Sequence, residues 1–381
     1  MFSKNKKIIF RDAAILLALF LVSLGIVVLG AYYGGQKYLS PEYNWIWKYF
    51  PDPRLSGHQP QILDLLFPSD AQIHLEIADN WYQKNFLTWF PLYPFFIRAF
   101  DSFVANIRIS ALIASNLAFY LSLLTILSMI KNHFGSKTAW ITILLILFFP
   151  YSVCLHTGHS ESVFLLTAVL SFYFFEKRNY ALIVLFASLA CISRPYGIIV
   201  AMTIAIAFIV ESFTKRFDRR MLSILISPVS LFIYSCFNYY KTGDWLFWVH
   251  GRANLNVGGS ITLQNLLHLK LASSSRPLTI ELVTFFIFLL ILLISILNKE
   301  IRSKYYHYWI FALFLVVTPI IMNNLIGYGR YVATAFPVFL FAAIYFEKNR
   351  RSYFTVILTL ALLIFLLFFI SIQSAQMVFI A

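Results

Sequence analysis

Four ionisable residues that could do acid–base chemistry lie close together in a chain that is otherwise apolar and basic. Asp70, His74, Glu76 and Asp79 fall within ten residues. Residues four apart are neighbours on a helix, so a helical segment would place Asp70 and His74 on one face. A carboxylate beside an imidazole can act as an acid–base pair. The alternative is that these side chains only solvate a loop between membrane spans.

Three short polar turns, each at the edge of an apolar run, carry further candidates. The first turn contains His159 and Glu161, the second contains Arg194 and the third contains Arg330. Arginines match the geometry of phosphate oxygens, whereas histidines can move protons or bind phosphate. The alternatives are that Arg194 extends to the membrane surface, Glu161 caps a helix, Arg330 flanks a span and His159 is structural.

The composition is that of a membrane protein. Of 381 residues, 60% are hydrophobic and only 12% are charged, and the mean hydropathy is +0.77; soluble domains carry about 25% charged residues. Apolar runs of roughly 20 residues recur, each long enough for a bilayer core of about 30 Å. The net charge of +14 fits basic cytoplasmic loops better than a nucleic-acid partner. The three cysteines lack metal-ligand spacing.

We expect an all-α polytopic membrane protein, a single domain over residues 1–381, with about eleven transmembrane helices. A first long loop, about 32–105, is expected to hold short amphipathic helices on the membrane surface, and a second long loop covers about 241–277. The expected spans are 9–31, 110–130, 139–155, 162–175, 180–192, 196–210, 221–239, 278–297, 306–323, 331–346 and 353–372.

The distribution of basic residues predicts the orientation. With eleven spans and a cytoplasmic amino terminus, 18 of the 30 Lys and Arg residues fall in five short inner loops and one tail, as the positive-inside rule requires. The long loop with Asp70 and the turns with Glu161, Arg194 and Arg330 then all lie outside. Charges near hydrocarbon must be paired or face a wet cavity, so we expect them to share one cavity.

Four motifs in order resemble the bacterial relatives of PIG-V-type mannosyltransferases. The motifs are Asp-x-x-x-His-Leu-x-Ile-Ala at 70–78 with Phe-Pro-Leu-Tyr-Pro at 90–94, His-Ser-Glu-Ser-Val-Phe at 159–164, Ser-Arg-Pro-Tyr-Gly at 193–197, and Arg330-Tyr331 with Phe336-Pro337. The sequence departs from the family at Ser69, where Trp is usual, and at His74, where Tyr is usual. These two departures leave the acceptor and the sugar open.

The resemblance implies a GT-C glycosyltransferase that takes a hexose, as a mannosyltransferase does, from a polyprenyl-phosphate donor on the outer face of the cell membrane. The acceptor would be a lipid or a glycan. Asp70 matches the family's essential acidic residue and would act as base or orient the acceptor. Glu161 would orient the site, and Arg194 and Arg330 would hold the lipid phosphate, with His74, His159 and Tyr331 also contacting substrate. The motifs indicate no particular cofactor, and the acidic cluster is compatible with a divalent metal.

Two other classes of protein remain possible. A transporter or lipid flippase would carry broken helices and charges near the bilayer midplane, often in two matching halves. The charges here gather at one face, and no internal repeat is visible. A structural membrane subunit would fit if Asp70 were inert.

Overall fold

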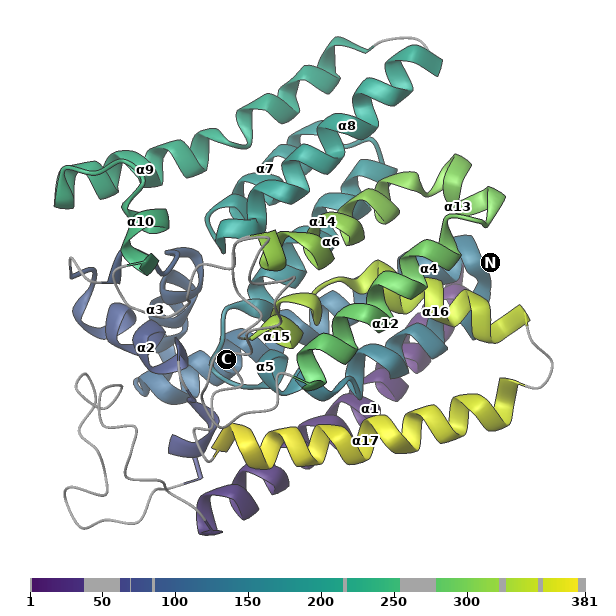
Figure 1. The fold of residues 1–381 in the computed structure, drawn as a ribbon, viewed down its shortest axis with the longest axis horizontal. Coiled ribbons are helices and arrows are strands. Elements are labelled where there is room, and N and C mark those ends of the chain that lie inside the picture. The colour runs from purple at the N-terminus through teal and green to yellow at the C-terminus, as the bar shows by residue number, and fades with distance from the viewer. Residues whose placement is uncertain are drawn as a thin grey trace.

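The structure is a computed structural model of the whole chain, and it describes residues 2–37, 62–68, 70–83, 86–214, 218–253, 279–321, 327–348 and 352–375. The described residues form only helices and their connections, as the sequence predicts. In Figure 1 most of the long helices run along the longest axis of the molecule. The short helices α2, α3 and α10 gather at one end of this bundle, and α13 lies at the other.

The helices follow one another without any strand in the described ranges. They are α1 (Phe2–Lys37), η3 (Asp64–Leu66), α2 (Asp70–Asn80), α3 (Leu92–Val104), α4 (Ile107–Leu147), η5 (Pro150–Ser152), α5 (Val153–His156), α6 (Glu161–Glu176), α7 (Tyr180–Cys191), η6 (Pro195–Gly197), α8 (Ile198–Thr214), η7 (Arg219–Ile226), α9 (Val229–Thr242), α10 (Phe247–Ala253), α12 (Thr279–Ser295), α13 (Lys299–Lys304), α14 (Tyr306–Ile321), α15 (Tyr328–Val332), α16 (Phe336–Lys348) and α17 (Ser352–Ala375).

The protein is a multi-pass membrane protein with five or six clear candidate spans. Within the described ranges, five helical segments are long and apolar enough to cross a bilayer: Phe10–Gly35, Ile107–Leu147, Pro195–Phe213, Arg219–Thr242 and Thr355–Ala375. A sixth arises if α5 and α6, bent by 92°, form one broken span. Helices also lie at the remaining predicted positions, but α7, α12, α14 and α16 are shorter. The number eleven therefore stays a prediction.

Helix α4 contains two of the predicted spans and the loop expected between them. Its 41 residues would measure about 60 Å if straight, twice the thickness of a bilayer core. The backbone leaves the helical conformation at Gly135, where φ is 85° and ψ is 169°. Glycine tolerates this positive φ because it has no Cβ.

Contacts with α1 show that α4 reverses direction at this break. Near the beginning of α1, Asp12 forms an ion pair with Lys131. Further along α1, the Ser23 hydroxyl donates to the Leu147 carbonyl at 2.7 Å, and a histidine at the end of α5 bridges Ser23 to Asn116. The two ends of α4 thus lie at one level of α1 and its middle at another, as two antiparallel spans would require.

One predicted span ends earlier than expected. The apolar run 139–155 was expected to be one helix, but α4 ends at Leu147 and the chain continues through η5 and α5. Pro150 has no amide hydrogen to donate to a continuing helix. The prediction is also wrong for the start of the tenth span, because Tyr331 belongs to the separate short helix α15 and α16 begins only at Phe336.

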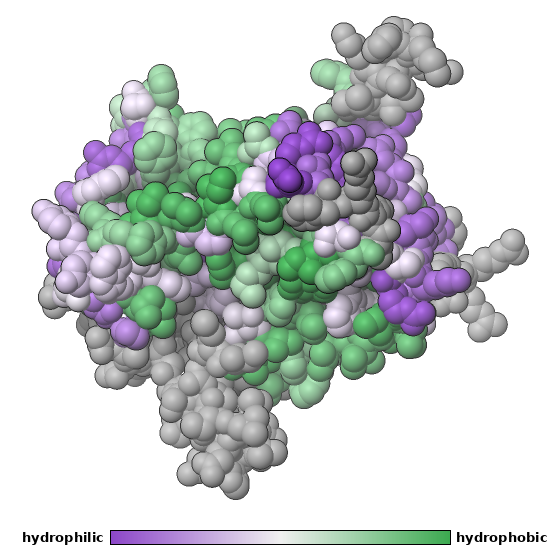
Figure 2. Space-filling model, turned by 90° about the horizontal axis from the view of Figure 1, so that it is seen from above, coloured by the Kyte–Doolittle hydropathy of each residue, from purple (hydrophilic) through white to green (hydrophobic). Residues whose placement is uncertain are grey.

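Helix α6 connects two chemically different ends of the bundle. It begins at Glu161 and runs 16 residues, about 24 Å, to Glu176, which contacts His133 and Tyr308. Just beyond, Arg178 pairs with Glu211. The basic loops predicted to be cytoplasmic therefore gather at the end away from Glu161. Figure 2 shows a hydrophobic middle between more hydrophilic ends.

The first long loop does contain short helices, as the sequence predicts. Helices η3, α2 and α3 follow one another between residues 64 and 104, and α3 packs against α4. Residues 38–61 of this loop, and residues 254–278 of the second long loop, lie outside the described ranges. The second loop begins with α10, which packs against α9.

Candidate functional site

Four charged residues from four separate segments meet in one network of ion pairs. Arg330 Nη2 lies 2.8 Å from Asp70 Oδ2, and Arg330 Nε lies 2.9 Å from Glu161 Oε1. Arg194 forms an ion pair with the same Glu161 oxygen. The Glu161 side chain is 1% exposed, whereas that of Asp70 is 27% exposed. The convergence predicted from the topology is thus present, with Glu161 at the centre and Asp70 at the edge.

Backbone contacts between distant segments hold this network together. The amide of Gly158 donates to the Leu66 carbonyl at 3.1 Å, which joins the turn before Glu161 to the segment before Asp70. The amide of Leu92, in the Phe-Pro-Leu-Tyr-Pro motif, donates to the Ile192 carbonyl at 3.2 Å, just before Arg194. The motifs far apart in sequence are therefore joined by main-chain hydrogen bonds as well as by charge.

The turn with Arg194 requires a glycine three residues later. A Cβ on Gly197 would lie 1.7 Å from the carbonyl oxygen of Ala190 in α7, so α7 and η6 can pack this closely only without a side chain there. We expect Gly197→Ala to lower the free energy of unfolding by about 1–3 kcal/mol and to displace Arg194. Thermal unfolding in detergent would measure the loss.

Gly25→Ala is the matched control for this substitution. Gly25 lies within α1, and none of the described atoms outside its own helix lies within 4 Å of an added Cβ. Alanine favours helix by up to about 1 kcal/mol over glycine, so this variant should be as stable as the wild type or more so. Equal melting temperatures for both variants would contradict the proposed close approach.

Tyr331 contacts both arginines of the network. Its ring centroid lies 5.1 Å from the Arg194 guanidinium and 5.3 Å from that of Arg330, and the ring packs edge-on against Tyr196 at an interplanar angle of 65°. Stacking on an aromatic ring suits the planar guanidinium. Tyr331 therefore fixes the arginines in place, and a direct contact with substrate stays a prediction.

His74 is buried beside the network and carries no charge at neutral pH. Its ring packs edge-on against Tyr93, 5.2 Å between centroids. Burial lowers the pKa of His74 to about 3, although the nearby carboxylates of Asp70 and Glu161 raise it. A neutral imidazole can hydrogen-bond a ligand but offers no charge to a phosphate, so we assign His74 a hydrogen-bonding role.

Acidification should therefore destabilise the protein through His74. Below about pH 6.5 the unfolded chain takes up a proton that folded His74 does not, so the free energy of unfolding falls as the pH falls. From pH 6.5 to 5 the loss is about 2 kcal/mol. Unfolding curves at both pH values should show this loss reduced in His74→Gln. In His250→Gln, a variant of an exposed histidine on α10, the loss should match the wild type; equal losses in all three proteins would contradict the assignment.

His159 lies in the turn between α5 and α6 and is also buried. Its Nδ1 is 2.9 Å from the Thr157 hydroxyl. Because Thr157 is also bonded to the Val153 carbonyl, the imidazole is held within the turn. Its contact with a substrate remains a prediction.

A small pocket unites six of the seven predicted site residues with others that the motifs did not single out. It has room for about 20 Å³ and is lined by Asp70, His74, Thr88, Trp89, Phe90, His159, Ser160, Glu161, Ser193, Arg194, Pro195 and Arg330. The sequence did not identify Thr88 or Trp89 as site residues, because aromatic and hydroxyl side chains are common at membrane surfaces. Their one distinguishing signal is that they directly precede the Phe-Pro-Leu-Tyr-Pro motif.

The charges of the network do not fit a divalent metal. Both carboxylates contact arginine, and within the described part of the chain no group of three or more His, Cys, Asp or Glu residues is placed to hold a metal ion. Asp70 and Glu161 together raise the pKa of Arg330 well above its usual value, against the effect of burial, which lowers it. The two arginines balance the two carboxylates, so an incoming anion would have to replace Asp70 on Arg330.

The fold is similar to that of known structures of the GT-C type. The crystal structure of ArnT from Cupriavidus metallidurans bound to undecaprenyl phosphate is similar, with a TM-score of 0.57 and 16% identity over 92% of this chain and 62% of that one. The apo oligosaccharyltransferase of Archaeoglobus fulgidus matches with a TM-score of 0.49 and 14% identity, over 93% of this chain and 56% of that one. The chain thus spans less than two thirds of the length of either structure.

The sequence is similar to a mannosyltransferase family over part of its length. The sequence model of the dolichyl-phosphate-mannose-protein mannosyltransferase family matches residues 90–240. This range contains two of the four motifs, with Glu161 and Arg194, and the Phe-Pro-Leu-Tyr-Pro half of the first, but neither Asp70 nor Arg330. No curated protein sequence matches the chain significantly. The resemblance to the PIG-V type in particular stays a prediction.

Proposed function

We propose that the protein is a membrane glycosyltransferase that transfers a hexose, with mannose the first candidate, from a polyprenyl-phosphate donor to a lipid or glycan acceptor. The observation that carries this proposal is the network in which Arg194 and Arg330 meet Asp70 and Glu161 in a buried pocket. The GT-C type of fold and the partial match to a mannosyltransferase family support it.

The geometry suits an inverting transfer in one step. Asp70, the more exposed carboxylate, would take the proton of the acceptor hydroxyl as its oxygen bonds to the anomeric carbon of the sugar. The bond from that carbon to the phosphate oxygen breaks, and Arg194 and Arg330 would stabilise the charge that develops on the leaving polyprenyl phosphate. Glu161, contacted by both arginines, would hold them in position.

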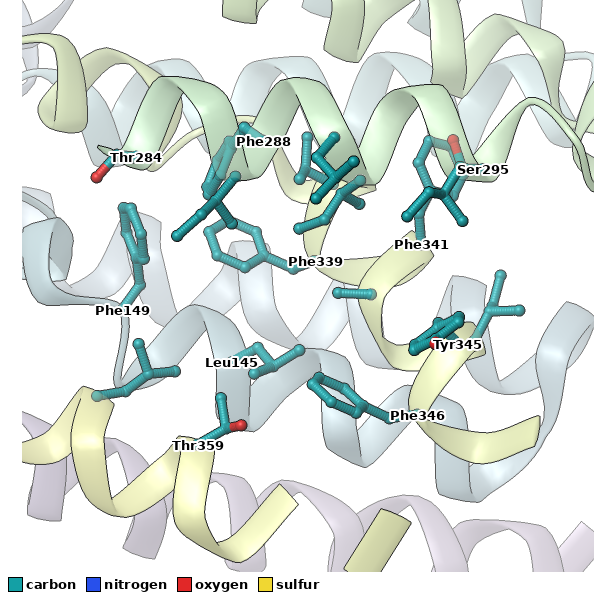
Figure 3. A pocket seen from close by; sticks show the side chains of 18 of the residues that line it. Leu145, Phe149, Thr284, Phe288, Ser295, Phe339, Phe341, Tyr345, Phe346 and Thr359 are labelled. Carbon is teal, nitrogen blue, oxygen red and sulfur yellow. The ribbon is translucent and has the colours of Figure 1, made fainter. Parts of the chain in front are cut away.

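A long apolar pocket could accept the prenyl chain of the donor. It has a volume of about 730 Å³ and is lined almost wholly by apolar side chains of α4, α12, α16 and α17. Figure 3 shows Phe149, Phe288 and Phe339 around one part of it. Phe149 and Pro150 line this pocket, and Tyr151 is the next residue along the chain. The Tyr151 ring packs against Gly329 so closely that a Cβ added to this glycine would lie 2.2 Å from the ring. Because Arg330 follows Gly329, the pocket ends near the network.

We further propose the orientation predicted by the basic residues, with the network at the outer face and eleven crossings. Asn80, exposed at the end of α2, and Lys177, exposed after α6, lie toward opposite ends of the bundle. In a Cys236→Ser background, a membrane-impermeant thiol reagent added to intact cells should label Asn80→Cys. It should label Lys177→Cys only after the cells are opened, and the reverse pattern would overturn the orientation.

A transfer assay tests the function itself. Purified protein in nanodiscs should transfer a radiolabelled hexose from polyprenyl-phosphate mannose, glucose or galactose to a membrane lipid or glycan extract. A donor truncated to a few isoprene units should react more slowly, because it leaves most of the apolar pocket empty. If none of the three donors is consumed while the lipid extract is translocated, a transporter or flippase replaces this proposal.

A further inference from the structure

Three buried polar atoms that line the small pocket, all outside the network of ion pairs, have no hydrogen-bond partner among the described residues. They are His74 Nδ1, Thr88 Oγ1 and Trp89 Nε1. His74 is 4% exposed and Thr88 is 1% exposed. Buried polar groups are almost always hydrogen-bonded, since leaving one unsatisfied costs free energy. Three such atoms in one pocket therefore indicate a ligand that the pocket is built to bind.

The segment that carries two of these atoms is held rigidly by its backbone. The hydroxyl groups of Tyr82 and Tyr234 both donate to the Trp89 carbonyl, at 2.7 and 2.9 Å. Tyr234 also donates to the Leu87 carbonyl at 2.9 Å. These hydrogen bonds to backbone carbonyls fix the positions of Thr88 and Trp89, and the polar atoms of their side chains stay available to a ligand. A preorganised binding site is built in this way.

The chemistry of the three atoms matches hydroxyl groups. The Trp89 indole only donates, a threonine hydroxyl donates and accepts, and a neutral imidazole nitrogen can do either. None of the three is charged, so they suit alcohol groups better than a phosphate or an ammonium group. The pocket has room for about 20 Å³, enough for one water-sized group, so a ligand would insert one hydroxyl-bearing edge.

We propose that His74, Thr88 and Trp89 form the subsite that binds hydroxyl groups of the sugar carried by the donor. This inference rests on the proposed function, in which Arg194 and Arg330, lining the same pocket, bind the phosphate attached to that sugar. The part of the hexose that faces this subsite therefore carries hydroxyl groups and no charged group. Trp89 and Thr88 are specificity-determining residues, and they lie outside the network of charges.

The test compares the binding of a donor with and without its sugar. Polyprenyl phosphate is used alongside the polyprenyl-phosphate mannose, glucose or galactose that the wild type binds most tightly, each in nanodiscs. Thr88→Val removes the hydroxyl and keeps the side-chain shape, and Trp89→Phe removes the indole N–H while keeping an aromatic ring. Each should weaken binding of the sugar-bearing lipid by about three- to tenfold and leave the affinity for the sugar-free lipid unchanged. Thr88→Ser, which keeps the hydroxyl, should bind the sugar-bearing lipid with the wild-type affinity.

Trp248→Phe is the matched control. Trp248 packs against Phe90 at 5.6 Å, but its indole nitrogen already donates to the Ser235 hydroxyl at 3.1 Å, so this variant should bind both lipids as the wild type does. Unchanged affinities in the Trp89 and Thr88 variants, or equal weakening for both lipids, would overturn the subsite. A wild type that binds neither lipid would instead overturn the proposed function.

Discussion

Replacing Asp70 by asparagine is expected to slow sugar transfer by at least about a hundredfold, because a general base contributes roughly 10²–10⁴-fold. The same variant should bind polyprenyl phosphate at least as tightly as the wild type. Arg330 contacts Asp70, so an incoming phosphate must compete with this carboxylate, and asparagine carries no charge to compete. Single-turnover rates and lipid binding in nanodiscs measure the two effects separately.

Asp64→Asn provides the control for charge removal in the same loop. Asp64 forms an ion pair with Arg108, and neither residue lines the small pocket. Its neutralisation should leave both transfer and lipid binding near the wild-type values. Transfer by Asp70→Asn at the wild-type rate would show that Asp70 is not the base, and weaker lipid binding would show that it does not compete for Arg330.

Replacing Glu161 by glutamine should be the most destabilising single change in the network. Its carboxylate is 1% exposed and contacts both Arg194 and Arg330. Breaking a buried ion pair by removing one partner leaves an uncompensated charge, at a cost of about 3–5 kcal/mol. Thermal unfolding in detergent should show the loss, and polyprenyl phosphate, which can neutralise the two arginines, should recover part of it.

A second Glu–Arg pair gives the comparison. Glu211 accepts two hydrogen bonds from Arg178, at 2.5 and 2.7 Å, but the Arg178 side chain is 40% exposed. Exposed pairs contribute about 0–1 kcal/mol, so Glu211→Gln should change the melting temperature little and should not respond to polyprenyl phosphate. Equal losses in both variants would mean that burial does not distinguish the two pairs.

Hydropathy and charge predict the all-helical fold and the meeting of distant charges, although not every helix boundary. Glu161, Arg194 and Arg330 each lie at the edge of an apolar run and Asp70 lies in the first long loop, and the positive-inside rule assigns all four to one side. The partners within the network could not be predicted, because they depend on side-chain positions across four segments. That Arg330 contacts both carboxylates, while Arg194 contacts Glu161, follows only from the three-dimensional structure.

The break in α4 and the hydroxyl subsite show two further limits of the sequence. Residues 131–138 look like a polar loop, yet they are helical apart from the one glycine at position 135 that reverses the chain. Thr88 and Trp89 look like ordinary interfacial residues, and only the absence of partners for their buried atoms, among the residues described, distinguishes them. Apart from the Phe-Pro-Leu-Tyr-Pro motif that follows Thr88 and Trp89, neither feature has a local sequence signature.

The contact between Arg330 and Asp70 has a consequence for turnover. The spent carrier is a phosphate monoester, which holds more negative charge near neutral pH than the diester donor because its second pKa is about 6. Two arginines would then retain the product more strongly than the substrate, and its release would limit the rate. Once Asp70 has passed the accepted proton to solvent, its carboxylate can return to Arg330 and lower this retention, so the proposed base would also help to expel the used lipid.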